Sequence, residues 1–454
     1  MQQINSYKVL HFPINTASLA AKNNKSLQQI GVSSEACLIK SYKHIPTISN
    51  EGASFLSFNG LECSKGVLPR GYQLFPISSF RAAFSPQTSL SLKTSLVLAR
   101  VWVIECARRV LNILPSHQYL QHFFASFGDK RRAKKLAFLS DVDIIHCYTG
   151  NLMGSAVEAV VRYYQLPGLA AWQGSEIRRP SIELQTNPYY HLLVLAEDGT
   201  SPYGDENRSY ARQRKMYDLG FEPLVTAGMR QYILPEYKGP IHQIFHPVSL
   251  DVEPDYPAIT NDHPVIVHAP SKRRGKGSEY VQKAIEQLRP LANFEYIEIT
   301  GAPREEALSL MRRCDIYVDQ MIFGDHGMAA IEAMSYGKPT VCYLKPSVCE
   351  LLPEDIPIIN ATVDNLSEKL LELINDPQMR HDFGVASRHY VEKYHDPLKT
   401  AARLDEIYRE ILSRKQKIGG VGVRIDPLVA LTIATQEDFL ASGTASAKSY
   451  DQVV

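Results

Sequence analysis

The residues best placed to do chemistry lie between positions 327 and 339. The run from Gly327 to Pro339, Gly-Met-Ala-Ala-Ile-Glu-Ala-Met-Ser-Tyr-Gly-Lys-Pro, predicts a helix that begins at a glycine and turns into a strand. A helix that opens on glycine and small side chains lets an anion approach its free backbone N–H groups, where the peptide dipoles favour negative charge. Glu332, about one and a half turns into this helix, can accept two hydroxyls of a ribose. The pattern therefore predicts a site for a nucleoside diphosphate.

A second group of residues suits phosphate. The segment from His268 to Gly277, His-Ala-Pro-Ser-Lys-Arg-Arg-Gly-Lys-Gly, follows a predicted strand and places four cations within five positions. In such a loop, the ammonium of lysine can bind a diphosphate as a point charge, and the guanidinium of arginine can bind it through two parallel hydrogen bonds. The alternative is a solvated run of charge, which is a common outcome for a short basic motif. Its place in the same predicted domain as the Gly327 helix favours phosphate binding.

Polar residues also follow two predicted strands of the first half of the chain. His146 ends the apolar run that starts at Asp143, and Gln173 and Glu176 follow the strand Gly168–Trp172. In an open α/β sheet, ligands bind beyond the carboxyl ends of the strands. We therefore expect these three side chains to share one crevice.

The elements that position these groups alternate between strand and helix. The chain opens as strand, helix and strand, which implies a parallel sheet with right-handed crossovers, and a second such pattern begins at Pro264. Prolines and polar residues in 249–262 break any regular pattern, which indicates a linker. We expect an α/β protein with a domain at 1–250, a second at 262–400, and a helix and tail at 401–454, and we expect 180–209 to be rich in loops.

Composition restricts the function classes. The chain has 454 residues, 44% of them hydrophobic, and a formal net charge of +1, so there is no global attraction to nucleic acid. The seven cysteines are odd in number and form no Cys-x-x-Cys pair, which indicates buried free thiols rather than disulfides or a zinc site. No signal peptide or membrane span is evident, so we expect a cytoplasmic protein.

One segment bears on membrane contact. Apolar residues recur at helical spacing over 96–114, and the basic run 130–135 follows. One interpretation is a helix that lies on a membrane surface beside a polybasic patch. The other is a core helix with a solvated end, which such periodicity more often means.

The second half of the chain resembles the donor-binding half of a GT-B glycosyltransferase, close to the large retaining family four. The likeness covers residues 264–410 well and the first half weakly, through Asp143–His146 and Gly174–Glu176. The motifs that carry it in the second half are Pro270-Ser271, Lys276-Gly277, the run Cys314–Val318, and the segment from Gly327 through Glu332 to Pro339.

This resemblance implies two Rossmann-like domains facing a cleft, with a UDP or GDP sugar on the second and a carbohydrate, lipid-linked or protein acceptor on the first. Glu332 would bind the ribose of the donor. The diphosphate would be held by a set of side chains and amides: Lys276, Arg273, Ser271, and the backbone at Gly327, Met328 and Ala329.

Two positions depart from the family pattern. The family has two glutamates separated by seven residues, and the first of them corresponds to Gly324, with Asp325 beside it. Gln173 stands where the family often has histidine. Asp325, Gln173, Glu176 and His146 are therefore the candidates to position an acceptor hydroxyl, while His326 could contact the sugar or serve a structural role.

The cations supply enough charge for a diphosphate, so we expect no metal and no cofactor beyond the nucleotide sugar. A catalytically inactive nucleotide-sugar-binding protein or partner subunit, motivated by Gly324 and Gln173, remains an alternative, as does a sugar-nucleotide epimerase on the same plan. A dinucleotide-dependent oxidoreductase is disfavoured because neither half has Gly-x-Gly-x-x-Gly after its first strand. The sequence carries no prediction of oligomeric state.

Overall fold

The protein is described here by a computed structural model that covers residues 7–12, 19–39, 54–57, 60–62, 142–148, 158, 161, 165–194 and 206–418. The predicted helix at 96–114 and the basic run at 130–135 lie outside these residues. The chain divides into two compact units, and one of them, comprising 1–53, 143–151 and 167–415, contains both sheets that bear on function. The other unit contains the antiparallel pair β3 (Ser54–Ser57) and β4 (Gly60–Glu62).

The first sheet of the larger unit is parallel throughout. Its strands lie in the order β2 (Ser33–Ile39), β1 (Lys8–Phe12), β5 (Ile144–Tyr148), β6 (Gly168–Trp172), β7 (Phe221–Val225) and β8 (His242–Gln243). The associated helices are α1 (Leu19–Gln29), α8 (Asn207–Asp218) and the 3₁₀ turn η4 (Ala227–Tyr232). Every residue of β5 and β6 is buried, as expected for a parallel strand covered on both faces.

The second sheet is also parallel. Its strands lie in the order β10 (Glu295–Glu298), β9 (Val265–His268), β11 (Ile316–Val318), β12 (Thr340–Cys342) and β13 (Ile358–Asn360). The helices are α9 (Arg273–Lys276), α10 (Ser278–Leu288), α11 (Arg304–Arg313), α12 (Met328–Ser335), α13 (Pro346–Cys349), α14 (Leu366–Asn375) and α15 (Pro377–Tyr394). The expected α/β fold with two Rossmann-like domains is confirmed. The exact domain boundaries stay predictions.

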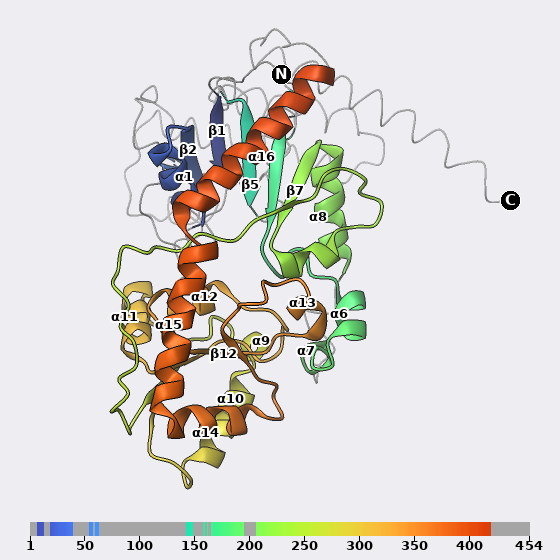
Figure 1. Ribbon diagram of the computed structural model, residues 1–454. Coiled ribbons are helices and arrows are strands. Elements are labelled where there is room, and N and C mark those ends of the chain that lie inside the picture. The colour runs from blue at the N-terminus through green and yellow to red at the C-terminus, as the bar shows by residue number, and fades with distance from the viewer. Residues whose placement is uncertain are drawn as a thin grey trace, which may run out of the picture. The chain divides into compact units, whose positions relative to one another are not determined.

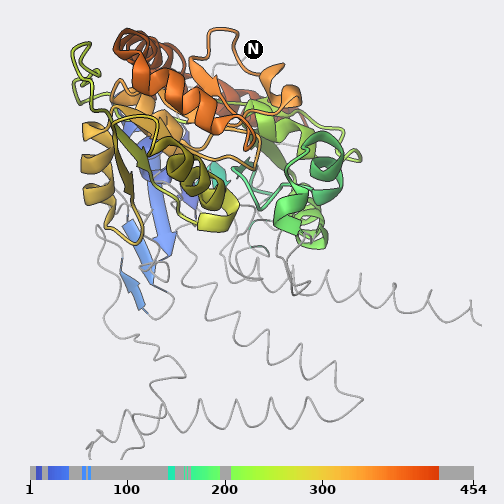
Figure 2. The same ribbon diagram turned by 90° about the horizontal axis from the view of Figure 1, so that it is seen from below.

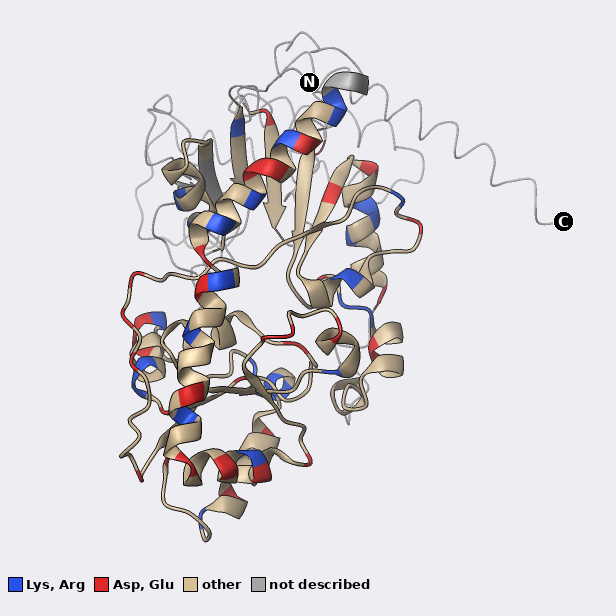
Figure 3. Cartoon of the chain, in the orientation of Figure 1, with Lys and Arg blue, Asp and Glu red and all other residues tan. Residues whose placement is uncertain are grey.

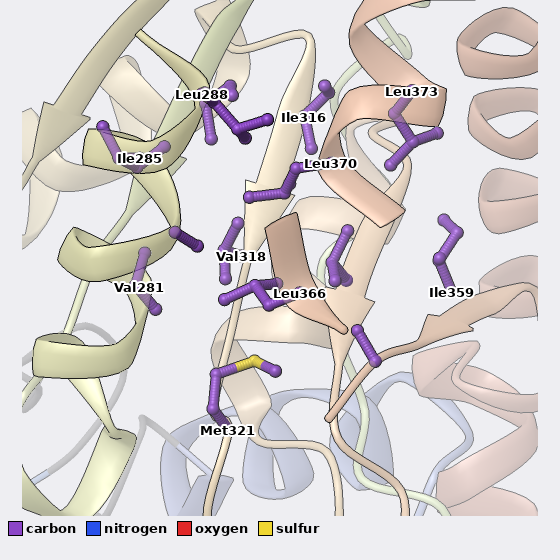
Figure 4. Close-up of a cluster of buried hydrophobic side chains, with 14 of the residues drawn as sticks. Val281, Ile285, Leu288, Ile316, Val318, Met321, Ile359, Leu366, Leu370 and Leu373 are labelled. Atoms are coloured by element: carbon purple, nitrogen blue, oxygen red, sulfur yellow. The ribbon is translucent and has the colours of Figure 1, made fainter. Parts of the chain in front are cut away.

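Alternation along the strands of the second sheet divides its core into two layers. Ile316 and Val318 pack with α10 and α14 (Figure 4), and Ile266 belongs to the same buried cluster. Figures 1 and 2 show these two helices on the same side of the sheet. Val267 and Tyr317, one position along, pack with α11 and α12 on the opposite face. Because both faces are buried, α12 is pressed against the sheet and its first turn is held at the carboxyl edge.

A single glycine joins α9 to α10. Gly277 has φ of 73°, in the left-handed region, and is both the C-cap residue of α9 and the N-cap residue of α10. A Cβ here would lie 3.0 Å from Cγ1 of Ile322. Glycine is therefore required by conformation and by space, and the turn it makes fixes where Lys276 points.

The expectation of loops over 180–209 was wrong. The segment contains α6 (Pro180–Thr186) and α7 (His191–Val194), and α8 begins at Asn207. Seven and four residues are too few for a helix to be stable alone, so tertiary packing must hold them. Tyr190 and Leu193 pack in one buried cluster with Ile322, which lies beyond β11.

The C-terminal helix α16 (Pro397–Ile418) runs across strands β1, β5 and β7 of the first sheet (Figure 1). Tyr408 of this helix is fully buried and its hydroxyl lies 2.6 Å from Nδ1 of His146. Arg414 forms an ion pair with Glu222 of β7 at 2.6 Å. Charges of both signs alternate along α15 and α16 (Figure 3), some of them as pairs four residues apart.

Gly384, inside α15, should not tolerate alanine. Gly to Ala in a helix interior normally stabilises by about 0.5–1 kcal/mol, but a Cβ at Gly384 would overlap the carbonyl oxygen of Gly337 and lie 3.1 Å from Cδ of Pro257. We expect Gly384→Ala to destabilise the protein by about 1–3 kcal/mol, measured by urea unfolding. Val385→Ala, a neighbouring half-buried site, is the control. Stabilisation by Gly384→Ala would contradict the close packing of α15.

Two further sequence predictions concern compartment. Within the part of the chain that the structure describes, no helix has the length and apolar character needed to cross a bilayer. Cys147, Cys314 and Cys342 are buried free thiols as expected, but Cys349 is exposed. Cys349 ends the short helix α13 at the surface, so its apolar sequence surroundings did not reveal its exposure.

Candidate functional site

The start of α12 is the centre of the candidate site. Gly327 is the N-cap residue, and its N–H donates to Oδ2 of Asp319 at 2.7 Å. Among the described residues, the next two amides, of Met328 and Ala329, have no hydrogen-bond partner. Free N–H groups at a helix start carry partial positive charge and can bind an anion.

Lys276 lies directly at this helix start. Its Nζ is 2.6 Å from Oδ1 of Asp319 and would lie 2.9 Å from a Cβ placed on Gly327. Gly327 is therefore needed so that the ammonium can approach the backbone. The structure therefore brings together the lysine of the basic loop and the glycine at the start of α12.

Asp319 is a residue that the sequence reasoning did not select. Only 1% of it is exposed, and its two oxygens hold the Lys276 ammonium and the Gly327 amide. It orders the two groups that the sequence predicts to bind phosphate, but it also neutralises the lysine, so a diphosphate would have to share Lys276 with it. The signal for it was available, because a carboxylate directly follows the buried strand Ile316–Val318 at its carboxyl end.

Glu332 lies on α12, with 6% of its surface exposed. Its Oε1 accepts a hydrogen bond from Arg304, the first residue of α11, and lies 3.5 Å from Nζ of Lys22 on α1. Burial lowers the pKa of Lys22, while the charge of Glu332 raises it. A ribose would have to compete with, or join, these two cations at the carboxylate. Neither Arg304 nor Lys22 was selected from sequence.

Arg273 and Ser271 lie farther from this centre. The Arg273 side chain is half exposed and pairs with Glu298 at the end of β10, and Ser271 is exposed. Among the described contacts, none joins either residue to α12. Their part in diphosphate binding therefore stays a prediction that would need Arg273 to leave Glu298.

The candidates that follow β6 form a closed turn. Oε1 of Glu176 accepts the backbone N–H groups of Gln173 and Gly174. Both polar atoms of the Gln173 side chain are buried and have no hydrogen-bond partner within the described part of the chain. Because a buried amide without partners is costly, Gln173 is the better candidate to bind a ligand hydroxyl, while Glu176 holds the turn.

His146 is placed differently from expectation. It is fully buried, stacks on Tyr148 with ring centroids 4.5 Å apart, and bonds Tyr408 of α16. Burial, with a smaller contribution from the charge of nearby His11, lowers its pKa well below the ordinary value. The sequence could not show that α16 would cover this strand end, and the geometry favours a packing role for His146 over acceptor contact.

The loop before α12 contains Gly324, at the position that corresponds to the first glutamate of the family pattern. Gly324 has φ of 71°, and its carbonyl accepts the N–H of Lys345 at 3.0 Å. A Cβ on Gly324 would lie 2.9 Å from Cβ of Lys345. A glutamate side chain therefore cannot occupy position 324 without displacing Lys345.

Asp325 is buried beside this glycine, with 5% exposed. Its Oδ1 accepts the backbone N–H of His326 at 2.8 Å and lies 2.9 Å from Nδ1 of the same histidine. No group of three or more His, Cys, Asp or Glu that could hold a metal ion occurs among the described residues.

Comparison with known proteins identifies what the second sheet resembles. Residues 263–390 match the family model described as glycosyl transferases group 1. The uncharacterized glycosyltransferase MJ1178 of Methanocaldococcus jannaschii is 30% identical over 124 residues, which is 26% of this chain. The chain spans only 35% of the length of that relative.

Two solved structures are similar over most of the chain. Sucrose-phosphate synthase from Thermosynechococcus elongatus has a TM-score of 0.52 at 12% identity, covering 90% of this chain and all (100%) of that one. Anabaena Alr3699/HepE, in complex with UDP and glucose, has a TM-score of 0.50 at 11% identity, covering 89% and 100%. At these identities the likeness concerns the fold, and it confirms the GT-B architecture.

Proposed function

We propose that this chain, which has a GT-B fold and whose residues 263–390 form a group 1 glycosyltransferase domain, moves a sugar from a UDP or GDP sugar to an acceptor. Retention of configuration at the anomeric carbon is part of the proposal. The acceptor is a carbohydrate, a lipid-linked group or a protein.

One observation carries the proposal. The Lys276 ammonium lies at the open start of α12, and Glu332 lies farther along the same helix. A diphosphate on the lysine and on the amides of Met328 and Ala329 would place an attached ribose near that carboxylate. No other group of described residues combines free helix amides, a lysine and an acid in this way.

The same groups suit the chemistry. When the bond between sugar and phosphate breaks, negative charge grows on the leaving phosphate, and fixed cations and amides stabilise that charge more in the transition state than before it. Lys276 and the α12 amides would supply this effect. Gln173 would hold the acceptor hydroxyl through its unpaired amide.

A second candidate function is nucleotide-sugar binding without catalysis. It is favoured by Gly324, because Lys345 packs where the first glutamate of the family pattern would project. Both functions share the donor site at α12 and differ only in whether transfer occurs.

Calorimetry followed by a transfer assay separates these functions. UDP, UDP-glucose, GDP and GDP-mannose are titrated into the protein, since Alr3699/HepE is seen with UDP and glucose. Binding of a nucleotide sugar with transfer to any member of a panel of sugar, lipid-linked and protein acceptors supports the enzyme. Binding with neither transfer nor hydrolysis supports the binding protein, and no binding at all contradicts both.

Glu332→Ala should weaken UDP binding by about 1.5–3 kcal/mol, because hydrogen bonds to a charged group are lost. The matched nucleotide is 2′,3′-dideoxy-UDP, for which the variant should lose almost nothing if Glu332 holds the two ribose hydroxyls. Glu305→Ala, exposed on α11, is the control variant. Equal losses for both nucleotides would contradict the ribose role and point to the Arg304 pairing instead.

A further inference from the structure

Asp325 and His326 form a pair whose proton arrangement can be read from the geometry. Oδ1 of Asp325 faces both the backbone N–H and Nδ1 of His326, at 2.8 and 2.9 Å. An ionised carboxylate can only accept hydrogen bonds, so Nδ1 must carry the hydrogen. In the neutral ring, Nε2 is then left with a lone pair and acts as an acceptor.

Asp325 itself is poorly placed to touch a ligand. Oδ1 is occupied by His326, and a Cβ on Gly228 would overlap Oδ2. Only 5% of the residue is exposed. Its carboxylate is thus enclosed, and its effect on a ligand must pass through the imidazole.

His326 stands immediately before Gly327, the N-cap of α12. Its side chain is 13% exposed, and the described residues offer Nε2 no hydrogen-bond partner. The titratable groups that interact electrostatically with Asp325 or His326 include His246, His395, Lys345 and Cys342. Burial lowers the pKa of His246 to about 4 and that of His395 to about 3, so both are neutral at physiological pH.

We propose that Nε2 of His326 accepts a hydrogen bond from a hydroxyl of the donor's sugar, with Asp325 as the positioning residue that fixes the tautomer. This inference rests on the proposed function. If the diphosphate of the donor binds the amides at the start of α12, the attached sugar lies close to His326, which immediately precedes the N-cap Gly327. The donor's sugar must then have a free hydroxyl at the position that faces Nε2 of His326. Gly324 has no side chain with which to contact the sugar, and His326, two residues later, would make a polar contact in its place.

The tautomer can be tested without any ligand. In ¹⁵N-labelled protein, at a pH where the ring is neutral, the ¹⁵N shifts of His326 should show Nδ1 protonated and Nε2 not. Asp325→Ala should release this preference. A protonated Nε2 in the unaltered protein would overturn the proposal, since that atom could not then accept a hydrogen bond.

The sugar contact is tested with His326→Phe, which keeps a ring but removes both nitrogens. UDP, UDP-glucose, UDP-galactose, UDP-N-acetylglucosamine, GDP and GDP-mannose are titrated into the protein and its variant. For the sugar nucleotide that gains most over its bare nucleotide, the variant should reduce that gain by about five- to tenfold, the effect of one hydrogen bond. Affinity for the bare nucleotide should be unchanged. His389→Phe, on the exposed face of α15, is the control.

Each other result is decisive. Equal loss for nucleotide and nucleotide sugar, or a loss seen only in transfer to acceptor, overturns the donor contact while leaving the proposed function standing. The donor contact is also overturned, and the proposed function still stands, if His326→Phe leaves the affinity for the sugar nucleotide unchanged. The same holds if no sugar nucleotide binds the unaltered protein more tightly than its bare nucleotide does. If the unaltered protein binds no nucleotide, the proposed function fails and the inference fails with it.

Discussion

A Lys345→Met variant is expected to unfold at a much lower urea concentration than the unaltered protein. Lys345 and Glu183 are both completely buried, at 0% exposure each, and Nζ lies 2.6 Å from Oε1. Burial lowers the pKa of Lys345, and the charge of Glu183 opposes that shift. Removing one partner of a buried pair leaves the other charge uncompensated, which costs about 3–5 kcal/mol.

Some compensation remains near Glu183. Tyr232 donates to Oε1, and Nε of Arg178 lies 3.9 Å away. We therefore expect the loss for Lys345→Met at the lower end of about 3–5 kcal/mol. Methionine keeps much of the side-chain volume, so the packing over Gly324 is largely retained and the effect reports the charge.

Two variants make the stability measurement specific. Lys345→Met combined with Glu183→Gln removes both charges and should recover at least half of the loss. Lys369→Met removes a partly exposed partner of Glu372 and should change stability by no more than about 0.5 kcal/mol. If Lys345→Met behaves like Lys369→Met, the buried pair is not formed in solution.

Lys276→Ala should weaken binding of UDP and UDP sugars by about 10- to 100-fold, as expected for charge-assisted hydrogen bonds worth about 1.5–3 kcal/mol. The loss has two parts. The ammonium no longer meets the diphosphate, and Asp319, 1% exposed, is left as an unpaired negative charge beside it. Binding of uridine, which has no phosphate, should change little.

Adding Asp319→Asn to Lys276→Ala tests the second part. The double variant should recover some affinity for UDP, because the repulsive charge is gone. Lys272→Ala, an exposed cation of the same loop, is the matched control and should cost much less. Equal losses for uridine and UDP in Lys276→Ala would mean that the lysine supports the fold and does not touch phosphate.

Local patterns in the sequence predicted individual elements of both domains. The helix Ser278–Leu288 buries Val281, Ala284, Ile285 and Leu288 along one face, and their spacing of three and four residues is visible in the sequence alone. The strand Gly168–Trp172 was predicted at its observed ends from its short apolar run, and all of its residues are buried. In both cases one neighbourhood of sequence contains the information that decides the element.

Contacts between distant residues were not predictable in this way. Arg304 and Glu332, or Lys345 and Glu183, are joined by a fold that no local pattern describes. α6 has no side-chain cap at Arg179 and is held by packing, so the local sequence predicted a loop there. His146 looked like a strand-end ligand group because the helix that covers it lies more than 200 residues later, at a sequence separation of 262.

The crossing of α16 has a consequence for biosynthesis. Residues Tyr7, His146 and Glu222 of the first sheet contact Asp405, Tyr408 and Arg414 of the last described helix. A ribosome makes the chain from its amino end, so the half that emerges first must wait until residues 405–414 have been made before its own interior is filled. The half that contains the second sheet, made later, closes its sheet sooner.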